Sequence, residues 1–317
     1  MLLLAGAASP AAWAEWHADE QSKMGTRIVV QLWHEDAREG ARLLAQAMAE
    51  FDRIEARMST YRDSSEISRV NREAAVAPVA VSAELHDLVS HSITVSRLSE
   101  GAFDITYESV GHLYALRERR LPTGAQIAAG LDAIDYRHLQ LDANARTIGF
   151  AVPGVRINLG GIAKGHACEQ VVDLLRAAGV EHALVSAGGD TRLLGDRRGR
   201  PWMLGIRDPD DADAVVTRLA LNDEAISTSG DYERYFDADG VRYHHILDPA
   251  TGRPTDGVRS VTVIGPDGTM TDALSTALFV MGTGAGLALI DSLPGYEALI
   301  IERGRAVRFS SGLAPPA

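Results

Sequence analysis

A glycine-rich segment followed by a lysine is one place in this sequence where residue types and spacing suggest chemistry. Residues 156–165 read RINLGGIAKG, so a short apolar run passes through two glycines into a helical pattern. Glycines let a ligand approach the backbone, and a helix N-terminus offers free N–H groups that suit phosphate. Lys164 falls in the first helical turn, where a cation opposes the helix dipole unless an anion lies beside it. The segment is either a phosphate-binding turn or an ordinary turn with a solvated lysine.

A carboxylate and a hydroxyl lie one helical turn apart near the C-terminus. Asp272 and Thr276 in the segment TDALST are four residues apart, so on a helix they share a face. Both are hard oxygen ligands, which suit Mg²⁺ when waters and substrate phosphate complete the shell. The alternative is that Thr271 or Asp272 is simply the N-cap of the helix.

Adjacent histidines precede a turn in residues 243–254, YHHILDPATGRP. Asp248, Pro249 and Gly252 are typical turn residues, so the strand is expected to end there. Neighbouring residues of a strand point to opposite faces, so one of His244 and His245 can reach a site while the other faces away. A neutral histidine can act as general base toward a hydroxyl. The alternative is a hairpin with two surface histidines.

Other candidate motifs carry less. Residues 226–231, ISTSGD, either line a polar pocket or form a capped turn. Residues 282–286, GTGAG, lack the full G-x-G-x-x-G and follow a helical pattern, which excludes a dinucleotide-binding fingerprint. Ser229 has no G-x-S-x-G surroundings, so a serine hydrolase is not supported. Cys168, the single cysteine, falls at an apolar position of a predicted helix and is expected to be buried.

The elements that must position these residues mix helices and strands without a strict alternation. Apolar spacing predicts helices over 36–58, 82–101, 123–131, 162–178, 272–281 and 286–292. Strands are expected at 27–33, 147–157, 182–186, 202–206, 215–221, 225–229, 232–236, 241–247, 259–264, 297–301 and 306–309. This pattern predicts an α+β fold with mixed or antiparallel sheets and packed helices. Residues 20–317 are expected to form a single domain, because no Pro/Gly/Ser-rich linker divides them.

The net charge and the N-terminal segment indicate which partners and which cellular location to expect. The net charge of −12 repels phosphate backbones, so no nucleic-acid partner is expected. Residues 2–12 are mainly apolar and residues 12–14 form an A-x-A site, which predicts that residues 1–14 are the back half of a signal peptide. The run is too short to cross a bilayer, so we expect an exported, periplasmic protein with no stable membrane span.

Taken together and in order, these segments resemble the ApbE family of FAD:protein FMN transferases. The matching segments are MGT at 24–26, MSTY at 58–61, SEI at 65–67, Asn71, GAFDIT at 101–106, NLGGIAKG at 158–165, GGD at 188–190, Trp202, GI at 205–206, DP at 208–209, ISTSGDYERYF at 226–236, HILDPATGRP at 245–254 and TDALSTALFVMG at 271–282. The resemblance runs from about Met24 to the C-terminus. Agreement of so many motifs in the same order is specific to this family.

The resemblance implies two lobes around a central flavin cleft and a role for each matched position. FAD, the substrate, would be bound by Met24, Tyr61, Ala102, Phe103, Asp104, Asn158, Lys164 and the backbone of His245 and Ile246. Mg²⁺ would be held by the Gly161 carbonyl, Asp272 and Thr276. The reaction would move FMN from FAD to a Thr or Ser hydroxyl of an exported redox protein and release AMP. That partner would also provide any association with the inner membrane. His245 is the candidate base, and Asp248 is the alternative.

The sequence departs from the family pattern at one position of the glycine segment. Asn158 stands where the family usually has Asp, and asparagine hydrogen-bonds without carrying a charge. A second, milder change is His166, where the family often has tyrosine. Asn158 therefore keeps open a flavin-binding protein without catalysis, and the same site would also serve an FAD pyrophosphatase that delivers FMN to water.

Overall fold

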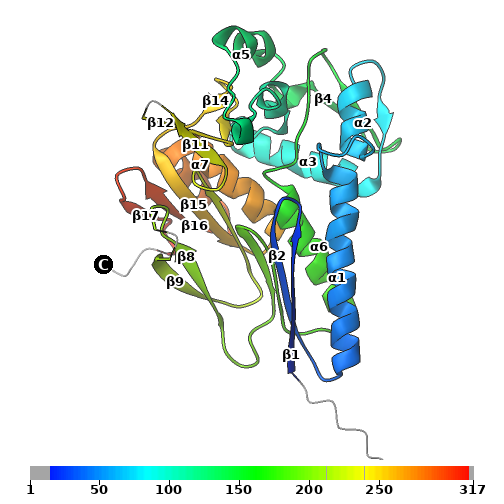
Figure 1. Cartoon of the computed structure of the whole chain (residues 1–317), viewed down its shortest axis with the longest axis vertical. Helices are drawn as coiled ribbons and strands as arrows, with labels where there is room; N and C mark the ends of the chain where they lie inside the picture. Colours follow the sequence, from blue (N-terminus) through cyan, green and yellow to red (C-terminus); the bar gives the residue numbers. More distant parts are fainter. Residues whose placement is uncertain (1–14, 212, 239, 314–317) are drawn as a thin grey trace, which may run out of the picture.

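A computed structural model describes residues 15–211, 213–238 and 240–313 of the chain (Figure 1). Its centre is an eight-stranded sheet in which every neighbouring pair of strands is antiparallel. In spatial order the strands are β1 (Glu15–Lys23), β2 (Thr26–His34), β6 (Ala183–Ala187), β7 (Asp190–Leu194), β10 (Ala225–Gly230), β15 (Val258–Gly265), β16 (Glu297–Glu302) and β17 (Val307–Phe309). The predicted α+β class is confirmed.

Long helices pack side by side against the sheet. Helix α1 (Ala37–Met58) contacts β1 and β2, α6 (Ala163–Ala177) contacts β6 and β7, and α7 (Gly268–Asp291) contacts β10 and β15. Asp36 caps α1 by accepting hydrogen bonds from the backbone N–H groups of Arg38 and Glu39. The apolar stripe of α1 and the apolar residues of α7 join one buried core, in which Phe51 and Phe279 are the largest fully buried side chains.

A further hairpin packs on the central sheet, against side chains that do not belong to the main core. Strands β8 (Trp202–Arg207) and β9 (Val215–Leu221) pair antiparallel, and Trp202 packs in a second cluster with residues that include Leu193 and Ile264. In β15 the alternating Val261 and Val263 belong to the main core, whereas Ile264 belongs to this second cluster. The two-residue alternation of the strand therefore supplies apolar side chains to both layers.

The remaining elements gather at one end of the molecule, in the upper part of Figure 1. The helical ones are α2 (Glu66–Glu73), α3 (Ala83–Leu98), η1 (Ile105–Tyr107), α4 (Glu108–Gly111), η2 (Leu116–Glu118), α5 (Gly124–Leu131) and η3 (Tyr136–His138). The small sheets are β3 (Val79–Ala80), β5 (Thr147–Phe150) and β4 (Leu139–Asp142), then β11 (Tyr235–Ala238) with β12 (Val241–His244), and β13 (Leu247–Asp248) with β14 (Arg253–Pro254).

The structure corrects several predicted elements. Strand β1 was not predicted, because its sequence EWHADEQSK is polar and it pairs with β2 alone at the edge of the sheet. Strand β7 was also missed, because Asp190 and Arg192 interrupt its apolar pattern. The two predicted C-terminal helices are one element, α7, with non-helical backbone only at Gly282. The predicted signal peptide, residues 1–14, lies outside the described residues.

Helix α7 is, by length and composition, apolar enough to cross a membrane. Within the described residues it instead packs against β10, β15 and α6. Its N-terminal residues, including Asp272 and Leu274, are buried in the protein. Because the core helix of a globular protein passes the same test, its composition is weak evidence for a membrane span.

Candidate active site

The Asn158–Gly161 turn lies between β5 and α6 in the chain and is hydrogen-bonded to η1 and α4. The Asn158 backbone N–H donates to the carbonyl of Ile105 at 2.9 Å, and its side-chain Oδ1 accepts from the Gly160 N–H at 2.9 Å. Its Nδ2 donates to Oε2 of Glu108 at 3.1 Å. The asparagine therefore shapes the glycine turn with its oxygen and joins it to α4 with its nitrogen.

Lys164 lies between two buried carboxylates. Its Nζ is 2.5 Å from Oδ2 of Asp190 and 3.7 Å from Oδ1 of Asp272. Burial opposes the charged form, but the two negative charges prevail and raise the pKa of Lys164. The lysine in the first turn of α6 thus has its counter-anions in the chain itself, which explains an otherwise unfavourable position.

The N-terminus of α6 differs from the phosphate site that the sequence suggested. The Gly165 N–H donates to Oδ2 of Asp272 at 2.9 Å, and the Ala163 N–H donates to the carbonyl of Leu159 at 2.8 Å. The expectation of free N–H groups was wrong here, because a carboxylate from α7 caps the helix. A phosphate near this turn would meet Lys164 rather than a row of open N–H groups.

The predicted metal ligands come from α7 and the glycine turn. The N-cap of α7 is Asp267, so Asp272 lies inside the helix and shares a face with Thr276. A Cβ on Gly161 would lie 3.1 Å from Oγ1 of Thr276, so the hydroxyl faces the glycine turn. Burial, followed by the charge of Asp190, raises the pKa of Asp272.

These atoms suit a hard cation. Oδ2 of Asp272 accepts from the Gly165 N–H, Oδ1 lies 3.7 Å from Lys164 Nζ, and the Gly161 carbonyl is the third predicted ligand. The described residues contain no cluster of three or more His, Cys, Asp or Glu side chains that could hold a metal. A site of one carboxylate, one hydroxyl and one carbonyl fits Mg²⁺, which keeps several positions for water and phosphate oxygens.

The two histidines have different surroundings, as the strand alternation predicts. His244 is buried: its Nε2 lies 3.0 Å from the Thr255 carbonyl, and its Nδ1 accepts from the Ile246 N–H at 3.3 Å. His245 is solvent-accessible, although many protein atoms surround it. That crowding, together with the positive charge of Arg234, lowers the pKa of His245 to about 3. The imidazole is therefore neutral at pH 7, and the same low pKa makes it a weak base in the ligand-free protein.

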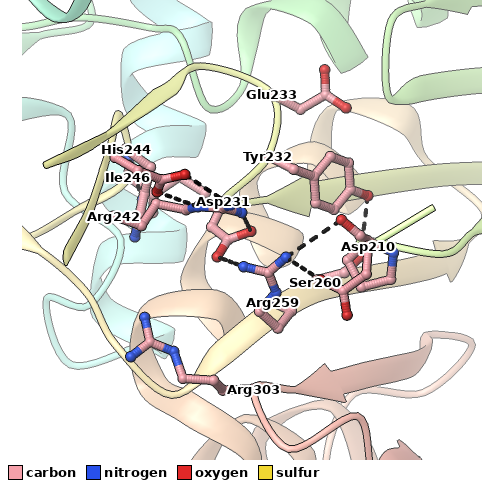
Figure 2. A network of polar contacts seen from close by, with 12 residues as sticks. Asp210, Asp231, Tyr232, Glu233, Arg242, His244, Ile246, Arg259, Ser260 and Arg303 are labelled. Carbon is pink, nitrogen blue, oxygen red and sulfur yellow. Dashed lines mark hydrogen bonds and ion pairs between the residues drawn. The ribbon is translucent and has the colours of Figure 1, made fainter. Parts of the chain in front are cut away.

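A buried ion-pair network holds the hairpin that leads to His245 (Figure 2). Asp231, at the end of β10, is 2% exposed and accepts from Arg242 at 3.3 Å and from Arg259 at 2.6 Å. Arg259 also reaches Oδ1 of Asp210 at 2.6 Å. Strands β10, β12 and β15 are thereby joined at one point, which fixes the start of the histidine segment.

Some of the remaining predicted flavin contacts are exposed, whereas others are already hydrogen-bonded within the protein. Met24 (φ +51°) and Gly25 (φ +70°) form the tight turn between β1 and β2, and Tyr61 is 88% exposed. An exposed aromatic ring is available for stacking. The Asp104 carboxylate instead accepts from Thr106 and from the Tyr136 N–H at 2.7 Å. A flavin contact at Asp104 would have to use its backbone or a remaining lone pair.

The neighbours of Asp104 and His245 are mostly buried. Phe103 is buried, and its ring would be 3.3 Å from a Cβ on Gly161, while Ala102 is half-buried beside it. Ile246 is buried, and its carbonyl accepts from the Thr255 N–H at 3.3 Å. Asp248 accepts from the Ala250 N–H at 2.9 Å, so it builds the following turn. Of the two proposed bases, His245 has more side-chain atoms that are available to accept a proton.

Sequence reasoning missed three charged residues that belong to this region. Asp190 pairs with Lys164, Glu108 with Asn158, and the Arg234 guanidinium lies 3.2 Å from the Cβ position of Gly25. Asp190 and Arg234 stand within the matched segments GGD and YERYF, so these motifs could have indicated both residues. Glu108 stands in no such motif, and its partner is 50 residues away in the chain.

The central cleft stays a prediction. Two surface hollows lie away from these residues, one between β1 and α1 and one beside β16 and β17. What the geometry brings together is a lysine, two carboxylates and a hydroxyl beside a glycine turn, and the charge of that lysine also acts on His245. An α+β protein with that set of groups has the chemistry of a protein that binds a phosphorylated nucleotide with a divalent cation.

Comparison with known proteins identifies the family. The ApbE family model matches residues 24–300. The FAD:protein FMN transferase of Vibrio cholerae serotype O1 is 36% identical over 303 residues, covering 92% of this chain and 88% of that protein. The one from Treponema pallidum is 36% identical over 277 residues, covering 81% and 76%. This chain belongs to the ApbE family.

Solved structures agree with this assignment. The ApbE protein of Thermotoga maritima superposes with a TM-score of 0.88 at 33% identity, covering 94% of this chain and 98% of that one. The flavin transferase ApbE of Vibrio cholerae gives a TM-score of 0.83 at 32% identity, covering 93% and 96%. The similarity therefore extends over nearly the whole fold.

Proposed function

We propose that this chain is an FAD:protein FMN transferase, an enzyme that takes FAD as substrate and attaches its FMN half to a target protein. Relatives that it matches over most of their length carry that name. The observation that carries the proposal is the grouping of Lys164, Asp272 and Thr276 beside the Gly160–Gly161 turn. That grouping suits a diphosphate and a cation better than it suits a neutral ligand.

The predicted metal would be Mg²⁺, held by the Gly161 carbonyl, Asp272 Oδ1 and the Thr276 hydroxyl. When bound, it would supply positive charge to the diphosphate oxygens as the leaving phosphate gains negative charge. Lys164 adds a fixed positive charge 3.7 Å from the same carboxylate oxygen. Asp190 holds that lysine in place, so its position does not depend on the substrate.

His245 is proposed to accept the proton of the acceptor hydroxyl. The oxygen of a Thr or Ser side chain would then attack the FMN phosphorus, and a new P–O bond would form. The bond from that phosphorus to the oxygen shared with AMP would break, and AMP would leave with its electron pair. The low pKa of His245 reflects desolvation by the surrounding protein first and then the positive charges of Arg234 and Lys164, which an anionic diphosphate would offset. Asp248 remains the alternative base.

The cellular location of the reaction and the nature of its acceptor are also proposals. Residues 1–14 have signal-peptide character, which supports export to the periplasm. The acceptor would then be an exported redox protein with a Thr or Ser in its flavin-attachment motif. Any association with the inner membrane would come through that partner. Residues 20–317 would act as a single domain.

The proposal is tested with matched variants of Thr276. The enzyme is incubated with FAD, Mg²⁺ and a redox domain that carries an acceptor Thr, and covalent flavin is read by in-gel fluorescence. Thr276→Val keeps the side-chain shape but loses the hydroxyl, so we expect the Mg²⁺ concentration at half-maximal rate to rise by about 10-fold to 100-fold. Thr276→Ser keeps the hydroxyl and should stay near wild type. Equal Mg²⁺ dependence of both variants, or transfer undiminished by EDTA, would contradict the metal site.

The pyrophosphatase alternative uses the same site with water as acceptor. It is separated from transfer by measuring AMP release without the acceptor domain. Slow release that accelerates when the domain is added supports transfer. Fast release that ignores the domain would instead make the chain a hydrolase. A flavin-binding protein without catalysis would release no AMP in either case.

A further inference from the structure

Glu108 is a nearly buried carboxylate that the proposed mechanism does not use. It is the first residue of α4 and is 9% exposed. Its Oε2 accepts a hydrogen bond of 3.1 Å from Nδ2 of Asn158, and Arg156 contributes a positive charge nearby. A buried carboxylate is costly unless it is hydrogen-bonded, so Asn158 compensates for Glu108.

The second oxygen of Glu108 is available. Within the described residues no group donates to Oε1, and this atom is not among the buried side-chain atoms that lack a partner. Oε1 therefore keeps some access to the outside. The carboxylate lies beside predicted flavin contacts: its partner Asn158 is one, and Asn158 Nδ2 also lies 3.5 Å from Oγ1 of Thr60, the residue before Tyr61.

The amide at position 158 is needed for this arrangement. Oδ1 of Asn158 already accepts from the Gly160 N–H, so Nδ2 must face Glu108. A carboxylate at position 158 would place two acceptors 3.1 Å apart, and they would repel unless they shared a proton. The identities of the two residues are thus coupled through one hydrogen bond.

We propose that Glu108 is a further substrate-binding residue of this enzyme, whose Oε1 accepts a hydrogen bond from an N–H or O–H donor of the flavin nucleotide while Asn158 holds Oε2. This inference rests on the proposed function. Asn158 acts as a positioning residue for that contact, because it fixes which oxygen of Glu108 remains free.

Reciprocal exchange of the two side chains tests the coupling. In Glu108→Gln, Asn158 still donates to the amide oxygen, so the new NH₂ group is left to face a substrate donor. In Asn158→Asp, two carboxylates meet. In the double variant Glu108→Gln/Asn158→Asp, the new amide NH₂ at position 108 donates to the new carboxylate at position 158, and the amide oxygen again faces the substrate. Each variant nearly keeps the side-chain volumes of the wild type.

The readout is the dissociation constant of FAD, from flavin fluorescence, with the melting temperature of the ligand-free protein measured alongside. We expect each single variant to bind FAD at least about tenfold more weakly and the double variant to return within about threefold of wild type. Glu181→Gln, an exposed carboxylate near the turn after α6, is the control and should change nothing. The same comparison with FMN and ADP assigns the donor to the flavin or the adenosine half.

Two results would overturn the inference. One is wild-type FAD affinity in Glu108→Gln, whether or not its stability changes, because the contact would then be absent. The other is a double variant no better than the sum of the singles, because the two sites would then be independent. If the wild type binds no FAD at all, the proposed function itself fails, and this outcome is distinguishable from both.

Discussion

At the scale of single residues, Asp272 illustrates how one side chain can serve the fold and the site together. Its Oδ2 accepts from the Gly165 N–H and caps α6, while its Oδ1 faces Lys164 and the proposed metal position. Replacing Asp272 would disturb both functions at once. Thr276 is the cleaner probe, because its hydroxyl hydrogen-bonds Ser229 at 3.1 Å and caps no helix.

The base assignment predicts different effects for the adjacent histidines. His245→Gln removes the proton acceptor but leaves the backbone, so we expect FAD affinity to persist while the transfer rate falls by about 10²-fold to 10⁴-fold. His244→Gln should lower the melting temperature, because His244 ties Thr255 to Ile246. Single-turnover rates and FAD titration separate the two. A wild-type transfer rate in His245→Gln would exclude it as the base.

Glu108 predicts a pH dependence of stability. Burial raises its pKa to about 7, even though the Asn158 hydrogen bond and Arg156 oppose the shift. The folded state therefore binds more protons than the unfolded state between about pH 4.5 and pH 7, and Glu108 lowers stability as pH rises through that window.

Urea unfolding of the ligand-free protein measures this effect. Between pH 5 and pH 8, the stability of Glu108→Gln relative to wild type should rise, by at most about 3 kcal/mol. The contributions of all other titratable groups to the pH dependence cancel in the comparison, because the two proteins differ only at residue 108. Parallel curves for the two proteins would mean that the Glu108 carboxyl is not perturbed. A variant that is more stable at pH 8 yet binds FAD more weakly would mark a residue retained for binding.

At the scale of elements, the site depends on how closely α6 approaches α7. A Cβ on Gly165 would lie 2.0 Å from the Gly268 carbonyl oxygen and 2.6 Å from Cβ of Asp272. Neither atom belongs to a flexible side-chain end, so the helices would have to separate. That separation would break the contact between Asp272 and the start of α6.

Gly165→Ala is therefore expected to destabilise the protein by about 3 kcal/mol or more and to abolish the Asp272 cap. Gly284→Ala is the matched control on α7, because a Cβ there meets nothing within 4 Å and the backbone is helical. That change should be neutral or stabilising by up to about 1 kcal/mol. Free energies of unfolding in urea test the pair, and equal effects of the two substitutions would contradict the close packing.

The elements also show what the sequence could and could not predict. Helix α1 and the pair Asp272–Thr276 follow from local periodicity, so spacing alone indicated their faces. Edge strand β1 has no fully buried side chain to mark it, so its polar sequence concealed it. The Lys164–Asp190 and Glu108–Asn158 contacts join residues 26 and 50 positions apart, and no local pattern contains that information.

At the scale of the whole molecule, the antiparallel sheet with its long helices brings the glycine turn and α7 together, and the proposed mechanism adds the histidine segment to them. The glycine turn enters from before α6, the metal ligands from α7, and the histidine from the hairpin that Asp231 secures. The superposition on ApbE structures over most of both chains agrees with the fold, and the place of the histidine in the site stays a prediction of the resemblance.

The central claim is that the flavin phosphate passes to a protein hydroxyl, and the most direct measurement is the ratio of AMP released to FMN attached. The enzyme is incubated with FAD, Mg²⁺ and an acceptor domain, AMP is quantified by chromatography, and attached FMN is quantified by intact-protein mass spectrometry. The account predicts one AMP for each FMN on the acceptor and no covalent product when the acceptor Thr is replaced by Ala. AMP formed without attached FMN, or an acceptor that gains no mass while FAD is bound, would contradict it.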